Sequence, residues 1–152
     1  MNAERLERMP LKQYIILRKD APTVTGAPVS PQKLAVMTAH ASMCFLSHQV
    51  LEHCNPDGHV VMDLDAEAFE WMHGPFTKIL LSAKNLHALE NAVRWSEECG
   101  FVEGKDFFCI RDDCATELLP DAGRKDCFIA IGYRPMEEER LRPVMKKFEL
   151  YR

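Results

Sequence analysis

The sequence lacks several features that would assign it to a specialised class of protein. It has no internal repeat and no low-complexity segment, and Gly26 with its neighbours forms no glycine-rich loop of the kind that holds phosphate. Uninterrupted apolar runs such as Tyr14–Leu17 and Ile79–Leu81 fall far short of the roughly 20 residues that span a bilayer. We therefore expect a soluble, cytoplasmic protein that has no membrane partner.

Clustered cysteine and an excess of basic charge are also missing. The six cysteines stand singly within helix-like and strand-like stretches, unlike the dense spacing of small secreted scaffolds, so we expect reduced thiols. The formal net charge of −4 argues against broad coating of nucleic acid, although a local basic patch can still contact a few phosphates. Any RNA binding is therefore expected to be directed to one site.

What is present is typical of one globular domain. The 152 residues are 47% hydrophobic and 28% charged, which provides enough apolar material for a core. Residues 1–10 are charged and lack a clear period, so we expect a flexible N-terminal segment before a domain at 11–152.

The hydrophobic pattern predicts an alternation of strands and helices. Strands are expected at 12–19, 76–83, 107–111 and 127–133, and helices at 31–51, 65–73, 85–100 and from 135 onward, with Pro143 interrupting the last. This order predicts an α/β three-layer sandwich, with helices on both faces of a mixed sheet of about four strands. The apolar strand 12–19 is expected to be central, and the last two strands, joined without a helix, to be antiparallel.

Ligands of such folds bind beyond the carboxyl ends of the parallel strands. Here that edge is expected to receive Arg18, Lys19, the start of the helix at 31–51, and the pair Asp112 and Asp113. Ser30 is a plausible N-cap of that helix, with Pro31 in its first position. We therefore expect these segments to converge on one site.

Lys33 and His40 lie on the predicted helix 31–51, two turns apart and on the same side. A lysine in the first turn opposes the helix dipole, which indicates an anionic ligand, although a solvated surface lysine is an equal alternative. His40 can donate to a substrate or transfer a proton, but a lone helical histidine is more often a packed core residue.

His40, Cys44 and His48 recur every four residues and predict either a zinc-binding stripe or three packing residues. The packing interpretation is favoured because no downstream cluster offers a convincing fourth ligand. Of the neighbouring Asp112 and Asp113, only one is expected to face the site, since adjacent strand residues point to opposite faces. Thr116 can orient water or a carbonyl, or can cap its own turn.

The chain from about Lys12 to Tyr151 resembles the second, archaeal and eukaryotic-type family of peptidyl-tRNA hydrolases. The resemblance rests on Tyr-Ile-Ile-Leu-Arg-Lys-Asp in the first strand, Lys-Leu-Ala-Val-Met-Thr-Ala-His-Ala-Ser in the helix, Ile-Arg-Asp-Asp-Cys-Ala-Thr after the third strand, and Ala-Ile-Gly-Tyr-Arg-Pro in the last strand. It implies hydrolysis of the ester of peptidyl-tRNA by a water molecule, without metal or other cofactor, and an ability to form a homodimer.

The resemblance implies site residues one by one. Lys33, His40, Asp112 and Thr116 match catalytic positions. Substrate-binding roles are expected for Arg18, Lys19, Met37 and Arg124.

Three positions depart from the family pattern. Met37 replaces the usual glutamine, and Cys114 with Ala115 replaces the Gly-Arg pair of the Asp-Ala-Gly-Arg-Thr signature, so Arg124 is a candidate to supply the missing guanidinium. These changes leave a second hypothesis, a weak or inactive member that binds RNA, a nucleotide-like ligand or a protein partner.

Overall fold

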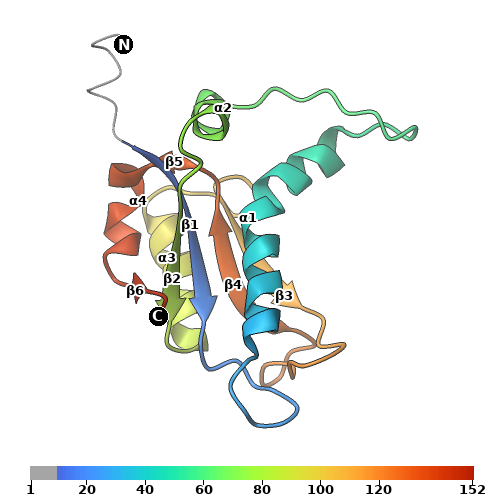
Figure 1. The fold of residues 1–152 in the computed structure, drawn as a ribbon, viewed down its shortest axis with the longest axis vertical. Helices are drawn as coiled ribbons and strands as arrows, with labels where there is room; N and C mark the ends of the chain where they lie inside the picture. The colour runs from blue at the N-terminus through green and yellow to red at the C-terminus, as the bar shows by residue number, and fades with distance from the viewer. Residues whose placement is uncertain (1–9) are drawn as a thin grey trace.

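The computed structural model describes residues 10–152 as a mixed sheet with helices on both faces (Figure 1). In chain order the elements are β1 (Leu11–Arg18), α1 (Pro31–His53), α2 (Ala66–His73), β2 (Lys78–Ala83), α3 (Leu86–Glu98), β3 (Phe107–Asp112), β4 (Cys127–Tyr133), β5 (Met136–Glu137), α4 (Glu138–Met145) and β6 (Glu149–Leu150). The predicted α/β class is confirmed, whereas the flexible segment expected at 1–10 falls, except for its last residue, outside the described residues.

The sheet has six strands, so the prediction of about four was wrong. The strand order is β3-β4-β1-β2-β6, and β5 pairs with β1. The additional strands β5 and β6 have two residues each, which is too short to produce an alternating pattern in the sequence. The central place of β1 and the antiparallel pairing of β3 with β4 are confirmed.

Three strands of this sheet run in the same direction. β1 is parallel to β2 and antiparallel to β4, and β4 is in turn antiparallel to β3. The carboxyl ends of β1, β2 and β3 therefore meet along one edge of the sheet, at the bottom of Figure 1. We call this the carboxyl edge, where the fold rule places a ligand.

Strand β1 is buried on both faces, which explains its nearly continuous apolar sequence. Its odd-numbered residues Ile15 and Leu17 pack in the core beneath α1. Its even-numbered residues Tyr14 and Ile16 pack in the opposite core, beneath α3 and α4. The alternation of a strand thus builds two separate cores, one on each face of the sheet.

Helix α1 begins at the predicted cap. The Ser30 hydroxyl accepts a hydrogen bond from the Lys33 N–H at 3.2 Å, and Pro31 is the first helical residue. Farther along, α1 lies directly on β4 at Gly132, where an added Cβ would stand 2.0 Å from the carbonyl oxygen of Ala41. The absence of a side chain at Gly132 therefore sets how close α1 comes to the sheet.

Helix α1 also carries exposed apolar residues, including Val36, Met43 and Leu51. By length and composition alone it is apolar enough to cross a membrane. One such helix is a weak indication, since core helices of soluble proteins pass the same test. In this fold α1 packs against β4 through Met37 and Ala41, as a layer of the domain.

The last helix differs from its prediction at both ends. It begins at Glu138 instead of 135, because Met136 and Glu137 pair with β1 as strand β5. Pro143 lies inside α4, which continues to Met145 and is not divided at the proline.

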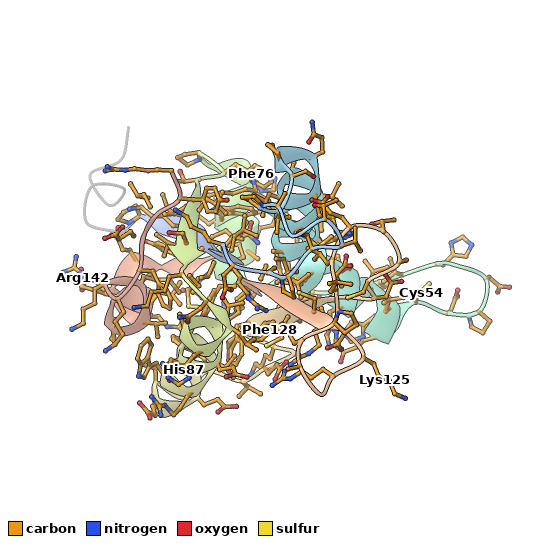
Figure 2. All side chains as sticks on the ribbon, turned by 90° about the horizontal axis from the view of Figure 1, so that it is seen from below. Cys54, Phe76, His87, Lys125, Phe128 and Arg142 are labelled. Atoms are coloured by element: carbon orange, nitrogen blue, oxygen red, sulfur yellow. The ribbon has the colours of Figure 1, made fainter. Side chains whose placement is uncertain are left out.

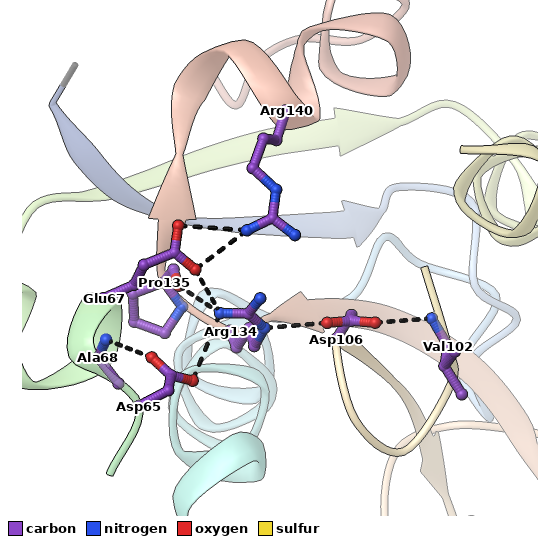
Figure 3. Close-up of polar contacts among 8 residues, drawn as sticks. All are labelled: Asp65, Glu67, Ala68, Val102, Asp106, Arg134, Pro135 and Arg140. Carbon is purple, nitrogen blue, oxygen red and sulfur yellow. Dashed lines mark hydrogen bonds and ion pairs between the residues drawn. The ribbon is translucent and has the colours of Figure 1, made fainter. Parts of the chain in front are cut away.

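Arg134, at the end of β4, joins α2 to the sheet (Figure 3). Its guanidinium bonds Glu67 of α2 at 2.7 Å and Asp106 at 3.0 Å. Burial alone would raise the pKa of both carboxyls. The hydrogen bond from Arg134 instead lowers the pKa of Glu67 below its usual range. Hydrogen bonds from the Val102 N–H and from Arg134 do the same for Asp106. This cluster lies at the end of β4 away from the carboxyl edge and has a structural role.

Candidate active site

Three of the predicted site residues converge at the carboxyl edge. The Lys33 ammonium lies 2.6 Å from Asp112 Oδ2 and donates to the Thr116 hydroxyl at 3.4 Å. The Lys33 and Asp112 side chains are only 15% and 7% exposed. An ammonium, a carboxylate and a hydroxyl thus meet at one partly buried point, which is shielded from water enough to strengthen their interactions.

The Asp112 side chain lies on the face of β3 that α1 covers. Phe108 and Ile110, four and two residues earlier, pack in the core between α1 and the sheet, so Asp112 falls on the same face. Asp113 is exposed and its carboxylate accepts the N–H of Ala115 instead. One of the two neighbouring carboxylates therefore faces Lys33, as strand alternation predicts.

The turn after β3 holds the second oxygen of Asp112. Asp112 Oδ1 accepts the backbone N–H of Cys114 at 2.9 Å, and Cys114 has a φ of 62°. This left-handed conformation favours glycine, the residue that the family signature has at this position. The Asp112 carboxylate is thus fixed through both of its oxygens, one by the turn and one by Lys33.

Glu117 joins this turn to the start of α1 and was not identified from the sequence. Its carboxylate accepts the Ser30 N–H at 2.6 Å and the Ser30 hydroxyl at 2.7 Å. These hydrogen bonds lower the pKa of Glu117. No local pattern could have revealed the pair, because 87 residues separate its members. The contact holds Thr116 beside the first turn of α1.

His40 does not join the cluster of Lys33, Asp112 and Thr116. Its side chain is exposed, and within residues 10–152 it forms no hydrogen bond or ion pair. The zinc-binding stripe of His40, Cys44 and His48, the less favoured alternative, is not assembled in the described residues either. The Cys44 thiol donates to the Ala41 carbonyl, His48 pairs with Glu52 at 3.2 Å, and no group of three metal-ligating side chains converges within the described part of the chain.

Met37 and Arg18 are buried instead of facing a ligand. Met37 is 3% exposed in the core between α1 and the sheet, because it lies on the helix face that packs on β4. Arg18 is 5% exposed, and its guanidinium bonds Asp121 at 2.7 Å and Asp20 at 2.6 Å. Arg18 was expected to contact substrate, but in the structure its guanidinium forms a buried ion pair. Its partner Asp121 was not anticipated.

The two remaining basic residues have different surroundings. Arg124 bonds Glu90 of α3 at 2.8 Å, so its guanidinium is held on the α3 face and does not reach the Lys33 cluster. Lys19 is exposed at the end of β1, with its ammonium 5.2 Å from the centre of the Tyr151 ring. Of this pair, Lys19 alone has no ion pair within the described residues, and it stays a candidate for substrate contact.

A solved structure shares the fold over nearly the whole chain. It is that of a protein of unknown function from Agrobacterium tumefaciens str. C58, with a TM-score of 0.50 and 13% sequence identity, covering 95% of this chain and 100% of that chain. At this identity the likeness supports the fold alone. No curated protein matches the sequence.

The family assignment comes from a match to a sequence model. The model of peptidyl-tRNA hydrolase PTH2 matches residues 11–151, from the first residue of β1 to the last residue but one. The matched region contains the Lys33, Asp112 and Thr116 cluster and all of the helices and strands found in residues 10–152. The chain therefore belongs to the PTH2 family of peptidyl-tRNA hydrolases.

Proposed function

We propose that this protein hydrolyses the ester bond between the peptide and the terminal ribose of peptidyl-tRNA. Family membership supports the reaction class. The observation that carries the proposal is the contact of Lys33 with Asp112 at 2.6 Å, beside the Thr116 hydroxyl, at the carboxyl edge. Ester hydrolysis by water requires a base and a group that stabilises negative charge on the carbonyl oxygen, and this cluster offers both.

Asp112 is the proposed base. Each of its carboxylate oxygens has two lone pairs, and the Cys114 N–H and Lys33 occupy one on each oxygen. A free lone pair can therefore accept a proton from the attacking water. The water oxygen then bonds to the carbonyl carbon, and the carbonyl oxygen becomes an oxyanion. The proton passes from Asp112 to the leaving ribose oxygen as the ester bond breaks.

Lys33 and Thr116 are the proposed stabilisers of the oxyanion. Both are polar groups already held at the site, so they need little rearrangement as the charge develops. The first turn of α1 adds the positive end of the helix dipole beside Lys33.

We propose that His40 positions the substrate and takes no part in proton transfer. It lies seven residues beyond Lys33 on α1, about 10 Å along the helix axis. That separation is too large for both groups to act on the same ester oxygen. His40→Ala is therefore expected to raise KM and to leave most of kcat.

The experiment is hydrolysis of labelled peptidyl-tRNA by purified protein under single-turnover conditions. We expect Asp112→Asn to lower the rate by roughly 10²- to 10⁴-fold and Lys33→Ala by roughly 10²- to 10³-fold. Asp113→Asn is the matched control, because Asn can still accept the Ala115 N–H and the side chain points away from Lys33. Wild-type rates in both Lys33→Ala and Asp112→Asn would disprove the proposal.

One observation favours a second candidate function, binding of RNA without turnover. Ala115 stands where the family signature has arginine, and Arg124 cannot replace that arginine while it is bound to Glu90. Under this hypothesis the purified protein binds tRNA but does not cleave the ester. The Ala115→Arg variant would then gain hydrolysis, whereas an active wild type excludes the binding-only function.

A further inference from the structure

A concave surface opens at the carboxyl edge, on the face of the sheet covered by α3. It is a pocket of about 540 Å³ between the end of β2, helix α3 as far as Trp95, and the segment after α4. Four of its lining side chains are basic, namely Lys19, Lys84, His87 and Lys147. Figure 2 looks onto this edge, with His87 of α3 on the opposite side of Phe128 from α1. We call this cavity the α3 pocket.

The lysines of the α3 pocket have no carboxylate partner in the described part of the chain. Lys19, Lys84 and Lys147 form no ion pair within residues 10–152, whereas Lys33 is paired with a carboxylate. Lys147 lies 4.3 Å from the centre of the Trp95 ring, a contact that orients the ammonium without neutralising its charge. Glu149 is the only acidic residue among those that line the pocket.

This concentration of positive charge is unusual in a chain with a net charge of −4. Three ammonium groups around one cavity repel one another, and Glu149 is the one carboxylate in the lining that offsets this repulsion. An anionic ligand in the cavity would remove this cost. The pocket also has the planar Trp95 and the amide of Asn91 in its wall, so it offers more than a flat basic surface.

The pocket and the Lys33 cluster lie on the same edge of the sheet. Lys19 follows β1, Lys84 follows β2, and Asp112 ends β3. Three strand spacings separate β3 from β2 in the order β3-β4-β1-β2, which corresponds to about 14 Å. A stacked nucleic-acid strand covers that distance in about four nucleotides at 3.4 Å each.

We propose that the α3 pocket binds backbone phosphates of the tRNA, about four nucleotides from the ester that lies at Lys33 and Asp112. This inference rests on the proposed function, since it takes peptidyl-tRNA as the substrate. The RNA strand crosses the ends of β4 and β1 between the two sites. Lys19, which follows β1, is the pocket's lysine on the side nearer β4, and it contacts the backbone where the strand enters the pocket.

The first experiment measures binding of deacylated tRNA by fluorescence anisotropy, which needs no turnover. The variants are Lys84→Gln, Lys147→Gln and their combination. The control is Lys105→Gln, an exposed lysine just before β3 at the opposite edge of the sheet. Each lost phosphate contact is expected to weaken binding roughly five- to eightfold at 0.1 M salt, and to lower the slope of log K against log salt by about 0.7 to 0.9.

A second measurement fixes the position of the contact along the RNA. Two 3′-terminal fragments of tRNA are compared, one of two nucleotides and one of eight. The proposal predicts that the double variant weakens binding of the longer fragment and not of the shorter one. In hydrolysis of peptidyl-tRNA, the same variant is expected to raise KM several times more than it lowers kcat.

The results separate this inference from the proposed function. If Asp112→Asn retains full hydrolysis but the Lys84 and Lys147 variants lose tRNA affinity, the catalytic assignment fails and the α3 pocket stands as an RNA site. If hydrolysis depends on Asp112 while the double variant binds tRNA and its longer fragment like the Lys105→Gln control, the α3 pocket assignment is overturned.

Discussion

The close approach of α1 to β4 at Gly132 leads to a quantitative prediction for Gly132→Ala. The new Cβ would stand 2.0 Å from Ala41 O, 2.8 Å from the Ala41 carbonyl carbon and 2.9 Å from Cys44 Sγ. Ordinary contact begins near 3.4 Å, so the helix or the strand must move by about 1.4 Å, the difference between 3.4 and 2.0 Å. The obstructing atom belongs to the backbone, and no side-chain rotation can relieve the clash.

The expected cost is at the upper end of overpacking, about 2 to 3 kcal/mol. A domain of about 150 residues loses roughly 2 to 4 °C in Tm per kcal/mol, so Tm should fall by about 4 to 12 °C. Activity should fall as well, because the shift moves α1, which carries Lys33, relative to β3, which carries Asp112. The measurements are urea unfolding, calorimetry and hydrolysis of peptidyl-tRNA.

Gly26→Ala is the control for the loss of a glycine without a clash. Gly26 has a φ of 72° and no atom within 4 Å of the added Cβ, so its substitution should cost only about 1 to 2 kcal/mol of backbone strain and leave the site in place. The reasoning would be refuted if Gly132→Ala unfolded within about 0.5 kcal/mol of wild type.

Three further predictions concern the ion pair of Arg18 with Asp121, the contact of Ser30 with Glu117, and the buried thiol of Cys44. Asp121→Ala leaves the buried Arg18 without its best partner and should cost about 3 to 5 kcal/mol in urea unfolding, more than Arg18→Met combined with Asp121→Leu. Because the Ser30 N–H and hydroxyl lower the pKa of Glu117, that contact stabilises the fold above about pH 4.3 and is lost as pH falls through the lowered pKa. The Tm difference between wild type and Ser30→Ala should therefore narrow in acid, and a gap constant from pH 7 to pH 3 would contradict this. Burial raises the pKa of the Cys44 thiol to about 12, so at pH 8 iodoacetamide should label it far more slowly than the exposed cysteines, as mass spectrometry can measure.

Features that depend on local pattern could be predicted from the sequence. Tyr14–Leu17 are apolar on both strand faces because β1 is covered on both sides, and Ser30 followed by Pro31 marks the start of α1. The convergence of Lys33 with Asp112 could also be predicted, from a general rule on ligand sites in α/β folds. Lys33 lies on the helix that follows β1, and Asp112 is the last residue of β3, which runs in the same direction as β1.

Features that depend on distant partners could not be predicted. Arg18 looked available to a ligand because its partner Asp121 lies 103 residues away in a loop with no periodic pattern. The placement of Met37 illustrates a different limit. It falls between Lys33 and His40 on α1, but the helix turns that position toward β4, so a residue that looked like part of the site is core.

The structure of the turn at Cys114 shows which departure from the family signature affects the site. Replacement of glycine by cysteine would be serious if the backbone had changed, but Cys114 keeps a φ of 62° and its N–H still holds Asp112. The left-handed conformation costs roughly 1 to 2 kcal/mol, a stability effect that leaves the carboxylate in place. What the turn has lost is the guanidinium expected at Ala115, and Arg124 is held by Glu90. The departure therefore removes a positive charge from the turn while its backbone still holds the Asp112 carboxylate. Ala115→Arg should accordingly increase tRNA affinity or hydrolysis by more than Cys114→Gly does.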